Sequence, residues 1–309
     1  MQWNQIKTLF ILCFLVLDIY LIVQYMNKQE AADLALIKLQ DPTFDETLKE
    51  ENIKISMLPE EQPDEAFISL KQKTFSEKDK KDLAQLPNQT VDVIKDQFIV
   101  AAFKKPIPMP QPFTEENITE VVKRNIIYPS EYVFGEWNKE LNVLLFYQTK
   151  NNRPVYLNQN GILLIYLNNN NEMVSYTQAM LGDTVETGEK KKAIMPITAI
   201  EKLYNNNQLY SGDEITKVDL GFHTTVPLPN GVQVFLPSWR IVVNDDNCYF
   251  VSAIEADISA GNVVEFLDET LQANLLKVHM IQEDKKEVRE SVTAQLETRL
   301  ESIRRSETE

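Results

Sequence analysis

The sequence predicts an α+β protein, in which an N-terminal transmembrane helix precedes an extracellular body of antiparallel β-sheets with helices packed on them. Three observations lead to this prediction. An apolar run of bilayer length, residues 6–26, opens the chain. Runs of β-branched and aromatic residues then alternate with helical segments and turn residues. Two stretches, 114–182 and 193–260, repeat the same order of elements and predict an internal duplication.

The apolar run has the length of a membrane span. Its 21 residues are interrupted only by Lys7, Thr8, Asp18 and Gln24, and at about 1.5 Å per residue they form roughly 31 Å of helix. The following residues, NKQEAADLAL, lack the small-residue pattern of a signal-peptide cleavage site. The run therefore predicts an uncleaved anchor rather than an export signal or a buried core helix. The short segment before it favours a cytoplasmic N-terminus and a single-pass protein of the cell membrane.

Asp18 lies near the middle of this span, where an ionised carboxylate costs about 2.5–3.5 kcal/mol on insertion scales. Two interpretations are open: the carboxyl is protonated and tolerated, or it faces other helices and accepts a hydrogen bond. The second predicts a contact face built from residues three, four or seven positions away, with Gln24 as a second polar contact near the outer end. The predicted partner-binding residues of the span are Asp18, Gln24, Leu15, Leu21, Ile22 and Tyr25.

Local signals predict the first elements of the body. Two short extended runs occupy 53–55 and 66–73, and Ser76 with Asp79 forms a capping box that opens a helix. The run 90–103 is rich in β-branched and aromatic residues and predicts a strand. Four prolines then stand at alternate positions, which excludes a helix and favours extended geometry; they are Pro106, Pro108, Pro110 and Pro112.

These signals divide the chain into segments. The predicted segments are a short cytoplasmic N-terminus (1–5), the transmembrane helix (6–26), a helical connector with an N-terminal α/β part (27–104), a Pro-rich linker (105–113), the first helix-plus-strands repeat (114–182), the second repeat (193–260) and a charged helical tail (261–309).

The duplication is inferred from the order of elements. Each repeat opens with a helix, continues with two strand-like runs and ends in a hairpin. The alternative is that any two hairpins resemble one another, but the constant order and nearly constant offset favour a true repeat. The matched pairs are 118–125 with 197–204, 141–148 with 215–222, 154–157 with 233–236, and 162–180 with 239–257.

The tail predicts a marginal helix. A narrow apolar stripe runs through its charged residues and consists of Val288, Val292, Leu296, Leu300 and Ile303. Such a helix could dock on a partner or fray in water. Fraying is favoured, because a short helix with a thin stripe gains little by itself.

Composition limits the partners and the chemistry. The formal net charge is −15 and belongs to the body, since the span contributes one Lys and one Asp. Such a field repels nucleic acid and other anionic polymers. Cys248 is the only cysteine of the body, so the body forms no internal disulfide. The 8 glycines form no phosphate-binding loop, and no cofactor is expected.

The residues that could carry catalysis are isolated. His223 and His279 have no metal-ligand spacing to each other or to Cys248. The acidic pair at 245–246 lies in an Asn/Asp turn, and the pair at 115–116 lies in the first turn of a helix, where a structural reason accounts for each. We therefore predict no catalytic centre, no metal site and no enzymatic activity.

The stretch PSWR is the one unusual short motif of the body, because it places a tryptophan next to an arginine. Trp239 and Arg240 are residue types typical of binding hot spots, so they are weak candidates for partner binding. The structural alternative, a tryptophan packed under the sheet with Arg240 capping it, is favoured about three to one, since large aromatic residues commonly lie in cores.

Several stretches together resemble the YycI (WalI) family. They are WNQIKTLFILCFLVLDIYLIVQY, AFISLKQKTFSEKD, MPITAIEKLYNNNQL and LPSWRIVVNDDNCYFVSAIEADI, and the likeness extends to about residue 260. The resemblance implies a single-span regulator of the WalK–WalR two-component system of Gram-positive bacteria. It further implies a YycH-family companion protein, a complex with the sensor histidine kinase WalK, and an effect on cell-wall metabolism.

Two function hypotheses follow. The first is a non-enzymatic regulator that acts through helix–helix and ectodomain contacts. The second is a membrane-tethered extracellular enzyme or wall-binding module. A cleft lined by aromatic residues and carboxylates would favour the second, whereas sheet faces closed by helices would favour the first.

Overall fold

The computed structural model describes residues 7, 11–12, 14–25, 42–224, 231–282 and 285–306. Residues 14–25 are helical. The chain separates into two compact units. Unit 1 draws on residues 1–65, 190–219 and 238–260, and unit 2 on residues 66–189, 220–237 and 261–309.

Unit 1 is built on a sheet with the strand order β1-β11-β12-β13-β14. β1 is parallel to β11, while β12 and β13 form an antiparallel hairpin whose turn residues Asn244 and Asp245 both have positive φ. Asn and Asp tolerate this left-handed conformation, which confirms the predicted turn. The elements are α2 (Pro42–Glu50), β1 (Lys54–Ile55), α5 (Pro196–Asn205), the first part of β11 (Glu214–His223), the last part of β12 (Val232–Val243), β13 (Asn247–Ser252) and β14 (Ile258–Gly261).

Unit 2 is built on an antiparallel sheet with the order β3-β4-β9-β8-β6-β5. The central strands β6 and β8 are buried over almost their whole length, because helices cover both faces of the sheet. The strands are β3 (Gln89–Ile94), β4 (Phe98–Pro108), β5 (Tyr132–Asn138), β6 (Val143–Lys150), β8 (Ile162–Leu167) and β9 (Glu172–Ala179), with β7 (Arg153–Pro154) paired to β6 and the 3-10 turn η1 (Pro129–Glu131) before β5.

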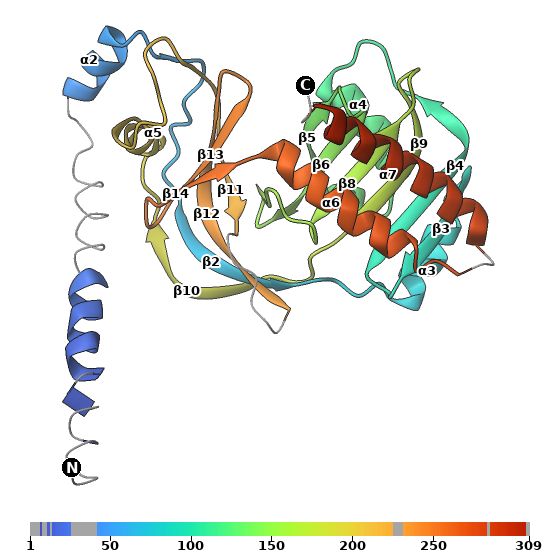
Figure 1. Cartoon of the computed structure of the whole chain (residues 1–309), viewed down its shortest axis with the longest axis horizontal. Coiled ribbons are helices and arrows are strands. Elements are labelled where there is room, and N and C mark those ends of the chain that lie inside the picture. Colours follow the sequence, from blue (N-terminus) through green and yellow to red (C-terminus); the bar gives the residue numbers. More distant parts are fainter. Residues whose placement is uncertain are drawn as a thin grey trace. The chain divides into compact units, whose positions relative to one another are not determined.

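Alternate residues of these strands meet different helices. One face packs with α3 (Glu77–Ala84) and α4 (Glu115–Lys123) in a core that includes Leu83, Val122 and Tyr176. The next residue along β9, Thr177, contacts Asn274 of α6 (Val263–Val278) and therefore faces the other way. α6 and α7 (Lys286–Ser306) cover this second face, as Figure 1 shows.

Unit 2 also contains part of a ribbon formed by β10, β2 and the first residues of β12. β2 (Asp64–Lys71) pairs with β12 on one side, from Phe235↔Ile68 to Val232↔Lys71, and with β10 (Val185–Lys192) on the other. A separate small core lies beneath the ribbon and contains Ile68, Leu70, Val155, Leu181, Phe222 and Phe235.

The structure confirms the α+β class, the antiparallel sheets, the capping box at Ser76 and the extended runs at β1 and β2. The single strand predicted over 90–103 is wrong, because Lys95 and Asp96 adopt positive φ and turn the chain between β3 and β4. The runs 233–236 and 239–243 were expected as separate strands, but both belong to β12.

The segments 141–148 and 215–222, which are matched in the predicted repeats, fall on β6 and β11, so β5 has no counterpart among the described strands of the second repeat. After α4, the strands β5, β6, β8 and β9 lie side by side in that order, and after α5 the strands β11 to β14 do the same. The duplication itself stays a prediction.

The prediction that the tail frays is wrong. All five residues of its apolar stripe are buried, with Val288, Val292 and Leu296 at 0% exposure. The stripe is thin, but the face of the unit 2 sheet supplies the partner surface that an isolated helix lacks.

The predicted membrane span is described only in part. Residues 6, 8–10, 13 and 26 of the span lie outside the described residues, as do residues 1–5 and 27–41. Within the part of the chain that the structure describes, no helix combines the length and the apolar character that a bilayer crossing requires.

Candidate partner-binding surfaces

The residues predicted to bind partners from the span share a helical segment. Leu15, Asp18, Leu21, Ile22 and Tyr25 all lie within residues 14–25, which are helical, and all are exposed. Because side chains three, four or seven apart project from the same side of a helix, these five residues form one face with Asp18 near its centre.

Gln24 is less available than the sequence suggests. Its Nε2 atom donates a hydrogen bond to the hydroxyl of Tyr20, four residues earlier, at 3.2 Å. A partner that binds the Gln24 amide through this donor would have to compete with that contact.

Trp239 and Arg240 lie inside unit 1 rather than on a surface. Trp239 has 0% exposure, and its Nε1 donates to the carbonyl of Ile194 at 2.9 Å. Arg240 is also buried. A buried indole with its N–H satisfied is the arrangement expected for a core residue, so the geometry supports the structural alternative for this pair.

The two histidines and the body cysteine occupy different environments. Burial lowers the pKa of His223 to about 4, so this imidazole is neutral at pH 7. His279 is exposed where α6 ends, and Cys248 is buried on β13. Among the described residues, no group of three or more His, Cys, Asp or Glu side chains is placed to hold a metal ion.

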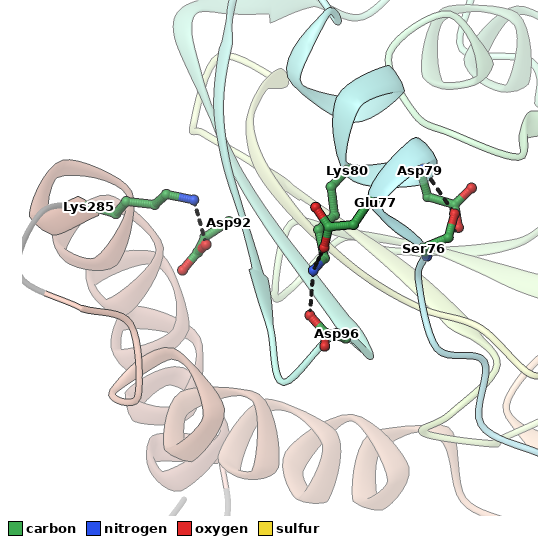
Figure 2. Close-up of polar contacts among 7 residues, drawn as sticks. All are labelled: Ser76, Glu77, Asp79, Lys80, Asp92, Asp96 and Lys285. Carbon is green, nitrogen blue, oxygen red and sulfur yellow. Dashed lines mark hydrogen bonds and ion pairs between the residues drawn. The ribbon is translucent and has the colours of Figure 1, made fainter.

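A polar surface surrounds the β3–β4 hairpin (Figure 2). Lys80 of α3 binds both Glu77 at 2.6 Å and Asp96 of the hairpin turn at 2.7 Å. Hydrogen bonds with Asp96 and Glu77 raise the pKa of Lys80. Lys285, just before α7, binds Asp92 of β3 at 2.6 Å and donates to the carbonyl of Val91. Through these ion pairs, Asp96 holds α3 and Asp92 holds the start of α7 against the hairpin. The role of both carboxylates is therefore structural.

Asp79 has a similar role at the start of α3. It accepts hydrogen bonds from the Ser76 backbone at 2.7 Å and from the Tyr128 hydroxyl at 2.6 Å. Burial would raise the pKa of Asp79, but these hydrogen bonds outweigh it and hold the pKa below its usual value. The pKa of Tyr128 rises to about 12 because of burial and this carboxylate. The pair therefore stays as carboxylate and phenol at neutral pH.

An open groove lies beside β2 and the start of β10. Its volume is about 550 Å³, and none of the described residues that line it is aromatic. Among its described lining residues, Asp183 carries a carboxylate, and Lys71 and Lys73 carry positive charges. It therefore lacks the aromatic, carboxylate-bearing character expected of a glycan-hydrolysing cleft. The remaining lining residues are Ser69, Leu70, Gln72, Thr74, Gly182, Val185 and Val232.

Sequence reasoning missed one buried charge, Arg299 of α7. Its NH2 atom donates to the carbonyl of Leu167 at 2.6 Å and to that of Asn142 at 3.3 Å, and the guanidinium lies 5.0 Å from the centre of the Tyr166 ring. Burial lowers the pKa of Arg299 to about 10. Arg299 follows Leu296 by three positions and therefore lies on the same side of the helix as the apolar stripe. This spacing was a signal in the sequence that the side chain is buried.

Comparison with known proteins gives one family. The family model described as YycI protein matches residues 33–254. No curated protein matches the sequence. One solved structure, described as an uncharacterized protein from Eubacterium rectale, aligns with 10% identity and a TM-score of 0.39, covering 67% of this chain and 85% of that chain. The helices α6 and α7 lie beyond the end of the family match.

Proposed function

Because this chain belongs to the YycI family, we propose that it is a membrane-anchored, non-enzymatic regulator of the sensor histidine kinase WalK. It acts together with a YycH-family protein and so affects cell-wall metabolism. The match of the family model over residues 33–254 carries this proposal. In the proposed arrangement, residues 6–26 cross the cell membrane once, the N-terminus is cytoplasmic and the body is extracellular.

Helices cover both faces of the unit 2 sheet, and this supports the function of a regulator rather than that of an enzyme. α3 and α4 pack on one face of this sheet, and α6 and α7 pack on the other. The described lining of the groove beside β2 contains no aromatic residue, and Asp96 and Asp92 of the β3–β4 surface are bound to lysines. Protein–protein contact is the function that these features support best.

Contact with the kinase is assigned to the face centred on Asp18. In lipid, packing and interhelical hydrogen bonds drive helix association, so one polar side chain can decide pairing. Leu15, Leu21, Ile22 and Tyr25 flank the carboxyl and supply the apolar contact. The partners would be the membrane spans of WalK and the YycH-family protein.

The test is the variant Asp18→Leu. It removes the costly carboxyl, so it inserts into the membrane at least as well as wild type. It also loses a hydrogen bond worth about 0.6–2 kcal/mol, which is roughly a 3- to 30-fold weaker association with WalK. Co-purification from solubilised membranes measures the association, and a WalR-dependent reporter measures regulation.

Val16→Leu is the matched control, because residue 16 lies roughly 200° round the helix from residue 18. It should change neither association nor regulation. If Asp18→Leu co-purifies with WalK as well as wild type does, the carboxyl does not contribute to binding, and the contact with WalK lies in the body.

The enzyme alternative has its own test. Replacing His223, His279 and Cys248 together with residues of similar size should leave signalling intact, since His223 and Cys248 are buried and the described residues contain no group of His, Cys, Asp and Glu placed to hold a metal ion. Loss of signalling in a folded, normally expressed triple variant would favour the enzyme.

A further inference from the structure

The strand β3 lies at one edge of the unit 2 sheet and, within the described residues, pairs only with β4. The backbone amide of Lys104 donates to the carbonyl of Asn88 at 2.9 Å, so Asn88 and every second residue after it direct their backbone groups toward β4. The backbone groups of Val91 and Val93 therefore point away from the sheet. The hydrogen bond from the Lys285 ammonium to the carbonyl of Val91 at 3.3 Å agrees with this direction.

Part of this edge is already protected. Lys285 binds the Val91 carbonyl and also the Asp92 carboxylate at 2.6 Å, and Figure 2 shows it reaching from the start of α7 to Asp92. Lysines on edge strands discourage pairing with other strands. Two residues further along, the amide and the carbonyl of Val93 have no hydrogen-bond partner within the described residues. The edge is therefore open at Val93.

A groove of about 460 Å³, here called the β3 groove, adjoins this open position. Its described lining combines residues 92–95 with Met280, Gln282 and Lys285, which lie between α6 and α7. The volume is within the roughly 300–1,000 Å³ that is typical of ligand sites. Met280 is 52% exposed, and its flexible side chain can adapt to an apolar partner. An open strand edge beside such a side chain is the arrangement that binds extended peptides by strand addition.

The charges of the β3 groove favour an acidic peptide. Its charged lining residues are two lysines, Lys95 and Lys285, and one aspartate, Asp92, which give a balance of +1 on a chain of −15. Asp92 is bound by Lys285, whereas Lys95 is exposed at the β3–β4 turn. An acidic side chain would therefore be attracted to Lys95 and repelled by most of the remaining surface.

We propose that the β3 groove binds an extended acidic segment of a partner protein, which adds to the β3 edge as an antiparallel strand. One residue of the segment exchanges two hydrogen bonds with the backbone of Val93, and the residue two positions later meets Val91. An apolar side chain, one position before the partner of Val93, packs on Met280. An acidic side chain one position earlier still lies near Lys95. Antiparallel pairing is assigned because it is the more stable of the two per residue.

The probe is a short peptide with capped ends and a fluorescein label at its C-terminal end. Its residues are glutamate, leucine, valine, threonine, valine and threonine, so that the two valines lie opposite Val93 and Val91. Fluorescence anisotropy measures its binding to the purified full-length chain. Methylation of both valine nitrogens removes the donors that face β3 and should weaken binding at least about tenfold. Methylation of both threonine nitrogens is the matched control, because these donors face away from β3, and it should change affinity less than about twofold.

Charge reversal tests the position of the acidic side chain. Lys95→Glu should weaken binding of the probe about 3- to 10-fold, because a repulsion replaces an attraction. A second probe, with lysine in place of the glutamate, should bind Lys95→Glu more tightly than wild type. Lys104→Glu is the matched control, since this exposed lysine lies opposite Asn88 at the other end of β3, and it should leave affinity unchanged. Circular dichroism establishes that each variant is folded.

Hydrogen exchange locates the added strand. A saturating concentration of probe should slow exchange of the Val93 amide at least about fivefold, whereas the Asp92 amide, which faces β4, should change little. The proposal is overturned if wild type does not bind the probe, if the two methylated peptides bind equally well, if Lys95→Glu in a folded chain has no effect, or if the Val93 amide is not slowed. No readout involves the kinase, so the result is independent of the proposed regulatory function.

Discussion

At the scale of single residues, Arg299 shows how a charge can be accommodated in a protein interior. Its guanidinium donates to two backbone carbonyls and stacks near Tyr166, and Gln295 on the preceding turn accepts two further hydrogen bonds from NH1. Burying a charge is costly unless hydrogen bonds compensate for it. The contacts to Leu167 and Asn142 also satisfy carbonyls at the end of β8 and after β5, and so attach α7 to the sheet.

Replacing Arg299 with Met should destabilise the protein by about 2–4 kcal/mol, because it removes several hydrogen bonds from a buried charged group, including the one to the buried carbonyl of Leu167. Urea unfolding of both proteins measures the difference. The control is Arg305→Met, whose exposed ion pair with Glu301 should contribute less than about 1 kcal/mol. Equal effects of the two substitutions would contradict the role given to Arg299.

The burial of His223 leads us to predict that the stability of the protein depends on pH. The folded protein holds its pKa near 4 by burial, whereas in the unfolded chain the pKa is near 6.5. Protonation therefore favours the unfolded state, and the stability due to neutral His223 is fully present above pH 6.5 and is lost as the pH falls toward 4. The difference between the two pKa values corresponds to at most about 3 kcal/mol.

The comparison is between wild type and His223→Gln, with the free energy of unfolding measured from about pH 7 to about pH 4. Wild type should lose more stability over this range than the variant, since carboxylate titration is common to both proteins. Parallel profiles would show that burial does not shift the titration of this imidazole.

At the scale of elements, α7 gains its stability from tertiary packing. Leu296 is completely buried, so Leu296→Ala should cost about 2–5 kcal/mol through lost contacts and the cavity left behind. The exposed neighbour Glu297 offers a control, and Glu297→Ala should change stability by less than about 0.5 kcal/mol. Chemical denaturation measures both.

Hydrogen exchange gives a second test of the same element. The backbone amides of α7 should be protected to nearly the same degree as those of β8, because the helix and the sheet bury one another. Exchange of α7 amides at the rate of an unfolded peptide would restore the fraying interpretation.

At the scale of the whole molecule, the proposed topology places the body outside the cell. Protease added to intact protoplasts should therefore remove the body, residues 27–309, detected with a tag at the C-terminus. A cytoplasmic protein serves as the control for protoplast integrity. Survival of the body until the cells are lysed would show that the orientation is reversed.

Local signals in the sequence determined several elements without help from the rest of the chain. Ser76 and Asp79 set the start of α3 because their capping bonds span only three residues. Asn244 and Asp245 set the β12–β13 turn through their own backbone preference. The apolar runs at β6 and β8 predicted strands for the same local reason. The alternation of such segments was enough to predict an α+β protein.

Only the tertiary structure decided the features that depend on distant partners. The stripe of α7 is too thin to hold a helix in water, and residues 141–180, more than a hundred positions earlier in the chain, supply part of the sheet face that buries it. Trp239 belongs to the core because the carbonyl of Ile194 accepts its N–H. The β3–β4 turn forms at Lys95 and Asp96 without glycine or asparagine, while β9 pairs along the other side of β4. Sequence patterns report the preferences of neighbouring residues, whereas burial and pairing depend on which segments the folded chain brings together.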